Sequence, residues 1–497
     1  MTDDLSAGIL ALIEEARRRS GDVGVTEQLD EIAARLTGPL RLAIAGKVKA
    51  GKSTLLNALL GEELAPTDAG ECTRILTWYR QDDRPHATLF PVDGAAPRER
   101  PYIREDGALR VDLGGTDPAD VDHLEIGWPT SRLRDLTILD TPGIASISAD
   151  VSARTERVLS TDDGRVPVAD AVLYLLRHTH STDIRFLESF HDDELAHGTP
   201  MNAVGVLSRA DEIGSCRLDS MAVADRVARR YAAEPRLRRL CPVIVPVNGL
   251  LGHAATTLRE AEYALLTTLA NAPLSEMGEL LLTADRLASR PTTLQITEIE
   301  RGHLLERFGL FGVRLAVELI RSGAAPTSVA LSTELAERSG LNRLRTVLTR
   351  QFETRSRVLK ARSALAALDD LLGSGTFDAP DLVSRSEEIA ARAHEFQEVR
   401  LLSDLRTGMV TLPADRQTEL DRLFGGTGHD PASRLGLPEN ATGDDLRQAA
   451  LGALASWHGT AEHPLTSRHD RIAARAAVRT LEGLLDQPLA DGVGDRM

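Results

Sequence analysis

The sequence has 497 residues, which is too long for one compact core and predicts two or three domains. Hydrophobic residues make up 42% and charged residues 27%, which is typical of a soluble globular protein. The formal net charge of −16 repels polyanions, so general binding of DNA or RNA is disfavoured and no nucleic-acid partner is expected.

The sequence predicts a cytoplasmic protein. Its three cysteines, Cys72, Cys216 and Cys241, have neither paired nor metal-type spacing, which suits a reducing compartment. The acidic start MTDDLSAGIL has no apolar core, so no secretory signal is expected. The most apolar helical pattern, 310–320, is too short to span a bilayer, and we expect a soluble or peripheral chain.

The order of patterns predicts an α/β head followed by helices. Apolar residues recur at helical spacing in two stretches before residue 38. Between residues 40 and about 250, β-rich runs alternate with helical patterns, which predicts a mainly parallel sheet covered by helices. The β-rich runs are 40–46, 123–128, 136–140, 171–176, 203–208 and 241–247.

After about residue 260 the strand patterns stop and long amphipathic helical patterns continue to the end. We therefore expect N-terminal helices over 1–37 that join the neck, an α/β head over 38–260, and an all-α neck and trunk over 261–497. The strongly apolar pattern from 304 to 320 is interpreted either as a buried bundle helix or as a membrane-inserting tip.

A glycine-rich turn follows the first buried run and contains three of the four lysines of the chain. Its spacing, G-x-x-x-x-G-K-[ST] between a strand and a helix, is typical of a phosphate-binding loop. Lys52 is expected to reach the β- and γ-phosphates and Ser53 to bind Mg²⁺. An ordinary glycine turn is the alternative. The predicted nucleotide-binding residues are Gly46, Lys47, Val48, Lys49, Ala50, Gly51, Lys52, Ser53 and Thr54.

Two further segments are expected to meet the phosphates. Asp140 ends the run LTILD, where a carboxylate holds Mg²⁺ through water, and the N–H of Gly143 is placed to meet the γ-phosphate. Thr73 precedes another run, and a threonine there binds Mg²⁺ through its hydroxyl when triphosphate orders the loop. Threonine is also common before strands, so that alternative stays open.

A possible guanine-reading segment follows the run AVGVLS. Ser208, Arg209 and Asp211 stand where [NT]-K-x-D is expected, and a carboxylate there accepts the two N–H donors of guanine that adenine lacks. Serine and arginine depart from that pattern, and an ordinary acidic helix start is the alternative. Arg209 is expected to stack along the base, and Asn248, after the last run, to touch the base edge.

These motifs, in this order, resemble the dynamin superfamily of large GTPases, with PTDAGECTR and LEIGWPTSRLRDLTILDTPG between the phosphate loop and the base segment. The closest resemblance is to bacterial dynamin-like proteins of the isoniazid-induced type. It implies Mg²⁺-dependent binding of GTP and GDP, GTP hydrolysis, and dimerisation through the heads. It also implies membrane remodelling, such as fission, fusion or envelope maintenance, at the inner face of the cell membrane, with a paralogous dynamin-like protein as a possible partner.

Two loop positions depart from the dynamin pattern. Lys49 replaces a serine that helps to place a monovalent cation, and related families carry at this slot an arginine that moves onto the phosphates. Our hypothesis is that Lys49 supplies this charge in cis; the alternative is that it points to solvent. Val48 replaces the glutamine that positions the attacking water, so hydrolysis is expected to be slow or to use another group. A regulatory GTPase without membrane remodelling and a low-activity partner subunit are the alternative functions.

Overall fold

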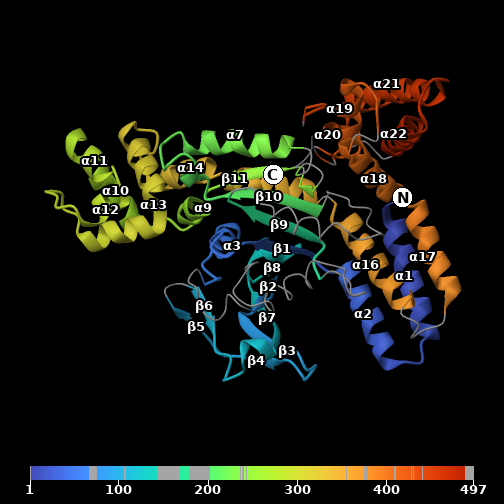
Figure 1. Cartoon of the computed structure of the whole chain (residues 1–497), viewed down its shortest axis with the longest axis horizontal. Coiled ribbons are helices and arrows are strands. Elements are labelled where there is room, and N and C mark those ends of the chain that lie inside the picture. The colour runs from blue at the N-terminus through green and yellow to red at the C-terminus, as the bar shows by residue number, and fades with distance from the viewer. Residues whose placement is uncertain are drawn as a thin grey trace.

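The structure is a computed structural model; its described elements before residue 260 include both strands and helices, and those after it are helical. It describes residues 2–66, 75–105, 108–142, 168–177, 202–234, 237, 240–241, 243–353, 355–373, 379–407, 410–426, 428, 430–438 and 440–486. Figure 1 shows a central sheet with helical regions on opposite sides of it.

Within the described residues, the main sheet has nine strands in the order β11-β10-β9-β1-β8-β2-β7-β3-β4. The part from β11 to β8 is parallel, and antiparallel pairs occur at β2/β8, β3/β7 and β3/β4. The predicted mainly parallel sheet is therefore confirmed. Its strands are β1 (Leu40–Gly46), β2 (Leu76–Gln81), β3 (His86–Pro91), β4 (Arg98–Glu99), β7 (Val121–Trp128), β8 (Leu136–Asp140), β9 (Ala171–Leu176), β10 (Ala203–Ser208) and β11 (Ile244–Val247).

Strand register brings the predicted phosphate and metal residues to one edge of this sheet. Ile44 pairs with Asp140 on β8, and Gly46 pairs with Leu175 on β9. The carboxyl ends of β1 and β8 thus lie side by side, as parallel pairing requires. A separate hairpin is formed by β5 (Tyr102–Glu105) and β6 (Ala108–Val111).

Helices cover the sheet and return to it late in the chain. The described helices of the head include α3 (Lys52–Leu60), α6 (Ala210–Ile213), α7 (Ser220–Ala233), α9 (Gly249–Thr256) and α15 (Leu341–Leu348), which a π-helix (Thr349–Glu353) follows. Leu341, Leu344 and Phe352 belong to the same hydrophobic core as β1 and α3. A segment far beyond residue 260 therefore packs into the head.

The chain between α9 and α15 forms a helical lobe with its own core (Figure 1). The lobe consists of α10 (Glu260–Ala270), α11 (Leu274–Leu280), α12 (Ala284–Ser289), α13 (Glu298–Arg321) and α14 (Ser328–Arg338). Leu304, Phe308 and Phe311 on α13 are buried in that core. Of the two interpretations of 304–320, the structure therefore supports the buried bundle helix.

Two more helical regions lie on the other side of the sheet (Figure 1). The neck bundle comprises α1 (Thr2–Arg19), α2 (Val23–Thr37), α16 (Ser356–Gly373) and α17 (Pro380–Arg392), which share one core. The carboxyl-terminal bundle comprises α18 (His394–Thr407), α19 (Ala414–Leu423), α20 (Pro431–Leu435), α21 (Gly443–Glu462) and α22 (Arg468–Asp486). The N-terminal helices thus pack with helices that follow the head.

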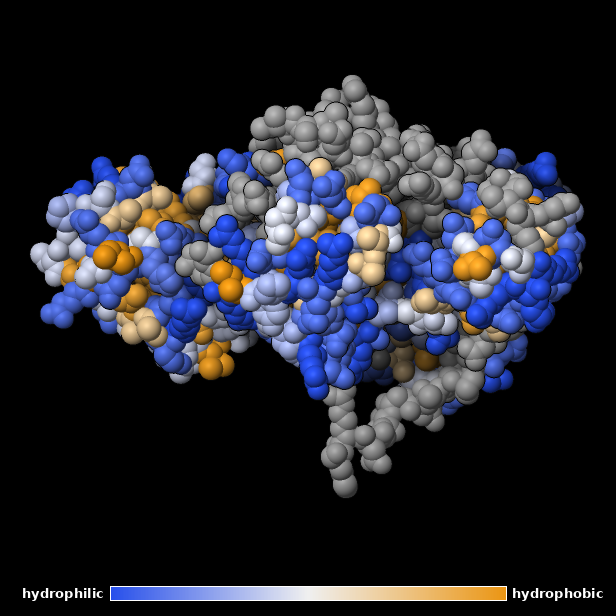
Figure 2. All heavy atoms as spheres, turned by 90° about the horizontal axis from the view of Figure 1, so that it is seen from below, coloured by the Kyte–Doolittle hydropathy of each residue, from blue (hydrophilic) through white to orange (hydrophobic). Residues whose placement is uncertain are grey.

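On the face seen from below, the described residues are mainly hydrophilic, and hydrophobic residues lie in small separate groups (Figure 2). Leu274 and Leu282 of the lobe are among the exposed apolar residues. No helix in the described ranges combines the length and the hydropathy that crossing a bilayer needs.

Candidate nucleotide-binding site

The loop between β1 and α3 has backbone conformations that few residues adopt. Gly46 has φ 151° and Gly51 has φ 91°, and Lys49 has φ 63° although it carries a side chain. A Cβ at Gly46 would lie 2.9 Å from the carbonyl oxygen of Leu175, so only glycine fits between the loop and β9. The left-handed Lys49 marks a strained position, and such positions concentrate at functional sites.

Lys52 begins α3 and turns its ammonium back into the loop. Its Nζ donates to the carbonyl oxygen of Gly46 at 3.2 Å and to that of Lys47 at 3.5 Å. Burial lowers the pKa of Lys52, and the nearby carboxylate of Asp140 opposes this effect. The lysine thus lies where a phosphate held by the loop would be its natural counter-ion.

Asp140 and Ser53 provide a set of oxygens suited to Mg²⁺. The hydroxyl of Ser53 donates to Oδ2 of Asp140 at 3.5 Å. The other carboxylate oxygen, Oδ1, is buried without a hydrogen-bond partner, and burial raises the pKa of Asp140 to about 6. An orphaned carboxylate oxygen beside a serine hydroxyl fits a hard divalent cation, which takes oxygen ligands.

The residue after Asp140 is fixed to the first strand. Thr141 donates from Oγ1 to the carbonyl oxygen of Ile44 at 2.9 Å and is buried. This bond sets the direction in which the chain leaves β8. Gly143 and Thr73, the other two predicted phosphate contacts, lie outside the described residues.

A cavity of about 190 Å³ lies beside the phosphate loop. It brings together residues from α3, β10, α6 and α9, segments that are far apart in the sequence. Of the residues predicted from the sequence, Ala50, Gly51, Thr54, Ser208, Arg209, Asp211 and Asn248 line it; the remaining lining residues are Leu55, Leu175, Val206, Glu212, Val247, Gly249 and Leu250.

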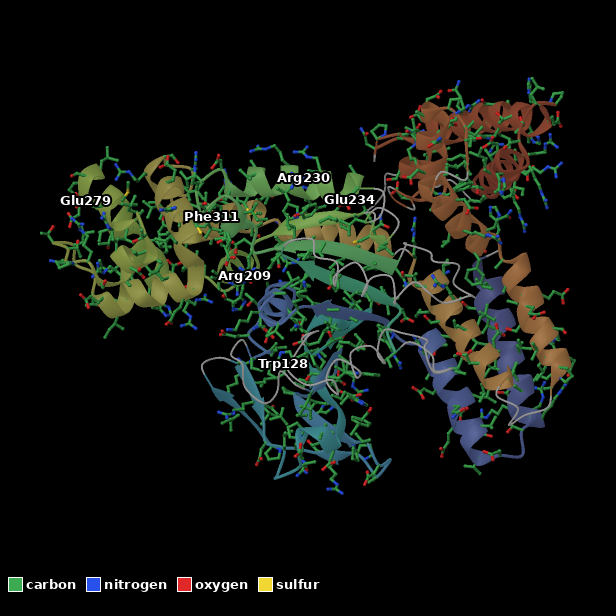
Figure 3. All side chains as sticks on the ribbon, in the orientation of Figure 1. Trp128, Arg209, Arg230, Glu234, Glu279 and Phe311 are labelled. Carbon is green, nitrogen blue, oxygen red and sulfur yellow. The ribbon has the colours of Figure 1, made fainter. Side chains whose placement is uncertain are left out.

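Arg209 takes a left-handed conformation at φ 50° and begins α6. Its Nη1 donates to Oε1 of Glu212 at 2.8 Å, and Glu212 also pairs with Arg177. Figure 3 shows Arg209 close to α3. Glu212 was not predicted from the sequence, although acid and base at i, i+3 are a recognisable pair.

Asp211 and Asn248 are two of the polar residues that line the cavity. Burial raises the pKa of Asp211. Asn248 is buried and caps α9, its side-chain oxygen accepting from the N–H of Leu251 at 3.0 Å. The hydroxyl of Ser208 is engaged elsewhere, since it donates to the carbonyl oxygen of Leu176 at 3.2 Å. Asp211 is thus the acidic lining group available to a base.

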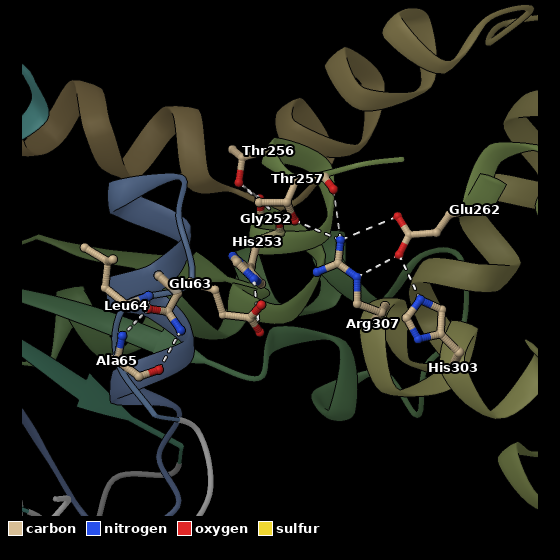
Figure 4. Close-up of polar contacts among 11 residues, drawn as sticks. Glu63, Leu64, Ala65, Gly252, His253, Thr256, Thr257, Glu262, His303 and Arg307 are labelled. Atoms are coloured by element: carbon tan, nitrogen blue, oxygen red, sulfur yellow. Dashed lines mark hydrogen bonds and ion pairs between the residues drawn. The ribbon is translucent and has the colours of Figure 1, made fainter. Parts of the chain in front are cut away.

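Asn57 at the end of α3 holds the chain that enters the segment containing Thr73. Its Oδ1 accepts from the N–H groups of Leu64 (3.0 Å) and Ala65 (2.8 Å), and its Nδ2 donates to the carbonyl oxygen of Ala65 (2.9 Å) (Figure 4). This closed set of bonds fixes the loop start relative to the phosphate helix. Asn57 was not predicted from the sequence.

His253 on α9 packs behind the same helix end (Figure 4). Burial lowers its pKa to about 4, with the charge of Arg307 acting in the same direction. Neither ring nitrogen has a hydrogen-bond partner among the described residues, and Oε1 of Glu63 lies 3.9 Å from Nε2. His253 is thus a neutral packing group between α3 and the lobe.

Comparisons with known proteins decide the family. A model of the Dynamin family matches residues 42–204. The isoniazid-induced protein IniC of Mycobacterium tuberculosis is 42% identical over 471 residues, covering 95% of this chain and 94% of that protein. The chain belongs to the dynamin family. It is a bacterial dynamin-like GTPase of the IniC type, and the resemblance inferred from its motifs is confirmed.

More distant members of the family match as well. The isoniazid-induced protein IniA of Mycobacterium tuberculosis is 27% identical over 478 residues, covering 94% of this chain and 63% of that protein. A bacterial dynamin-like protein of Nostoc punctiforme is 28% identical over 216 residues, covering 41% of this chain and 29% of that protein. The fold of a dynamin-type head with a helical remainder, predicted from the sequence, is likewise confirmed.

Proposed function

We propose that this dynamin-family chain binds GTP and hydrolyses it to GDP and phosphate with Mg²⁺. The supporting observation is a single cavity that joins the phosphate loop, at Ala50, Gly51 and Thr54, to the carboxylate of Asp211. A carboxylate there accepts the ring N–H and the exocyclic amino group of guanine. Adenine lacks that pair of donors, so the proposal includes a preference for guanine.

In this proposal Ser53 and Asp140 hold the magnesium ion, and Thr73, outside the described residues, completes the site. Bound magnesium neutralises phosphate oxygens of the nucleotide. Lys52 adds a second positive charge at the phosphates, and the N–H groups of residues 46–54 bind phosphate oxygens. Gly143, also outside the described residues, is proposed to meet the γ-phosphate.

We further propose that nucleotide binding drives dimerisation of the heads and that this is coupled to membrane remodelling. In this proposal the protein associates peripherally with the inner face of the cell membrane. Because the neck bundle combines α1 and α2 with α16 and α17, both ends of the head's sequence connect to one helical body. A movement of the head is thereby passed to that body as a unit.

A second candidate function is that of a low-activity GTPase that works through a paralogous dynamin-like protein. Val48 favours it, because this residue, half exposed at 50%, replaces the water-positioning glutamine and valine cannot orient water. A regulatory GTPase without membrane remodelling shares the same site chemistry.

Turnover of GTP and of ATP, measured with and without liposomes, separates these functions. The main proposal expects Mg²⁺-dependent GTP turnover that liposomes raise, with no ATP turnover. GTP turnover that liposomes do not change favours the regulatory GTPase, and turnover at the buffer rate under both conditions favours the partner subunit. Lys52→Ala is the control, because it removes a phosphate contact. If calorimetry detects binding of neither GTP nor GDP, all three proposed functions are overturned.

A further inference from the structure

A strained turn follows the helix that carries Asp211. Helix α6 ends at Gly214, and the next two residues, Ser215 and Cys216, both have φ 56°. Two consecutive non-glycine residues in the left-handed region are unfavourable on their own, because each Cβ crowds the backbone. Such a turn persists only where surrounding contacts hold it.

Within the head, the turn formed by Ser215 and Cys216 is hydrogen-bonded to the helix that carries Asp211. The N–H of Cys216 donates to the carbonyl oxygen of Asp211 at 2.8 Å, and the thiol lies 3.8 Å from its Oδ2. The N–H of Ser215 donates to the carbonyl oxygen of Glu212 at 3.1 Å. The turn is therefore bonded to the main chain of α6 and, through the thiol, to the carboxylate of Asp211.

Arg314, on α13 of the lobe, holds the turn from the outside. Its Nη1 donates to the carbonyl oxygen of Cys216 at 2.6 Å. The same guanidinium donates from Nε to the carbonyl oxygen of Leu281 at 2.8 Å and from Nη2 to that of Leu282 at 2.9 Å, at the end of α11. Three bonds in one plane use the rigid fork of arginine, which lysine cannot reproduce.

We propose that Arg314 is a positioning residue for the recognition of guanine. By holding the Cys216 carbonyl against α11 and α13, it keeps the strained turn formed and the Asp211 carboxylate directed at the base. The lobe is then part of the guanine site although none of its residues lines the cavity. This inference rests on the proposed role of Asp211 in reading the base.

The test compares the dissociation constants of GDP and IDP, since hypoxanthine lacks the exocyclic amino group that the carboxylate accepts. In the wild-type protein we expect tighter binding of GDP by about tenfold, the effect of one charge-assisted hydrogen bond. Arg314→Ala is expected to reduce this ratio to about two, and Arg314→Lys to leave it in between. Phosphate contacts are unchanged, so IDP affinity should be nearly that of the wild type.

Arg321→Ala is the matched control. Arg321 lies on the same helix and donates from Nη1 to the carbonyl oxygens of Ala270 (2.7 Å) and Ala272 (3.0 Å), with no bond to the turn. It should retain the full GDP preference. If Arg321→Ala loses as much of the GDP preference as Arg314→Ala, a general loosening of the lobe explains the loss and the proposal is overturned. An unchanged ratio of the GDP and IDP dissociation constants in Arg314→Ala would also overturn it.

Two more variants keep the test decisive. Ser215→Gly in the Arg314→Ala background should restore part of the GDP preference, because glycine adopts φ near 56° without strain. If Arg314→Ala does not fold, the GDP and IDP dissociation constants of Arg314→Lys are compared with those of the wild type instead. Asp211→Asn must abolish the preference: if it does not, or if the wild-type protein binds no GDP, the proposed base reading itself fails and the role of Arg314 with it.

Discussion

Asp140 has a raised pKa, which makes the stability of the folded protein depend on pH. Burial raises its pKa to about 6, above the value of a free carboxyl, so ionisation destabilises the folded protein as pH rises from about 4 to 6. We expect Asp140→Asn to unfold at a higher temperature than the wild type at pH 7.5 in EDTA, and the difference to shrink towards pH 5. If the difference in unfolding temperature between Asp140→Asn and the wild type does not change with pH, the pKa of Asp140 is not raised.

The raised pKa of Asp140 also predicts how the effect of Mg²⁺ on nucleotide binding depends on pH. A proton must leave Asp140 before a cation binds, so the gain in GDP affinity on adding Mg²⁺ should fall about tenfold per unit below pH 6. Titration of GDP at several pH values, with and without Mg²⁺, measures this gain. In Asp140→Asn the gain should be small at every pH.

Lys49 is exposed, with the backbone in the left-handed region. If its ammonium stabilises the transition state, as we propose, Lys49→Ala should lower kcat by about a hundredfold and change GTP affinity far less. Lys49→Arg, which keeps the charge, is the matched control and should retain most of the activity. Equal losses of turnover and affinity in Lys49→Ala would count against the hypothesis.

Among the elements, the sequence predicted those with a strong local pattern. The apolar run 171–176 coincides with β9, because a strand buried on both faces is continuously apolar. Strand β3, His86–Pro91, was not predicted, since its apolar residues alternate with polar ones and it lies near the sheet edge. The packing of α15 in the head was also not predictable, because amphipathic spacing does not tell which body a helix covers.

The candidate site was predictable to a similar degree. Residues 46–54, Asp140 and Asp211 follow from fixed spacings after strands, and the structure brings them to one end of the sheet. Glu212, Asn57 and Arg314 were missed because their roles are hydrogen bonds to backbone carbonyls, N–H groups or a neighbouring arginine. The contacts of Asn57 and Arg314 depend on tertiary placement and leave no spacing in the sequence, whereas Glu212 stands at i, i+3 from Arg209, a spacing that does not by itself indicate a nucleotide site.

The carboxyl-terminal bundle depends on a buried carboxylate. Burial alone raises the pKa of Glu398, but hydrogen bonds from His394 and Thr480 and the charge of Arg434 outweigh it and lower the pKa to about 2. Glu398→Gln leaves Arg434 without its counter-ion and should reduce the free energy of unfolding by about 3–5 kcal/mol at pH 7. Urea unfolding measures this loss.

The lowered pKa of Glu398 also determines how its contribution to the free energy of unfolding depends on pH. A lowered pKa means that the stabilisation is complete above about pH 4.5, the usual pKa of a glutamate side chain, and is lost as pH falls towards 2. The difference between wild type and Glu398→Gln should therefore shrink in that window. Glu334→Gln, which breaks a partly exposed pair with Arg338, is the control and should cost less than about 1 kcal/mol.

At the scale of the whole molecule, arginines and the fourth lysine join the helical regions to the head. Arg345 on α15 donates to the carbonyl oxygen of Ala58 at the end of α3 (3.0 Å), and Arg355 donates to that of Gly425 after α19. Lys360 on α16 donates to the carbonyl oxygen of Gly38, before β1 (2.8 Å). Each cation bonds carbonyls near the end of a helix, where the last carbonyls lack partners within the helix.

A buried ion pair joins the neck bundle to the head. Arg35 on α2 donates to Oδ1 of Asp170 at 3.1 Å, with side-chain exposures of 6% and 0%, and Oδ2 of Asp170 accepts from the N–H of Arg41 at 2.9 Å. Arg35→Met keeps the packing volume but leaves a buried carboxylate without its cation. We expect a loss of about 3–5 kcal/mol in the free energy of unfolding, measured in urea.

Arg19→Met provides the comparison, because Arg19 pairs with Asp381 within the neck bundle at side-chain exposures of 41% and 55%. Solvent screens that pair, so its loss should cost less than about 1 kcal/mol. If Arg35→Met also exposes α1 and α2 to hydrogen exchange while the head stays protected, the pair attaches the neck to the head and does not merely stabilise both. Equal effects of the two substitutions would show that burial of the Arg35 pair adds nothing, because water would then screen both pairs alike.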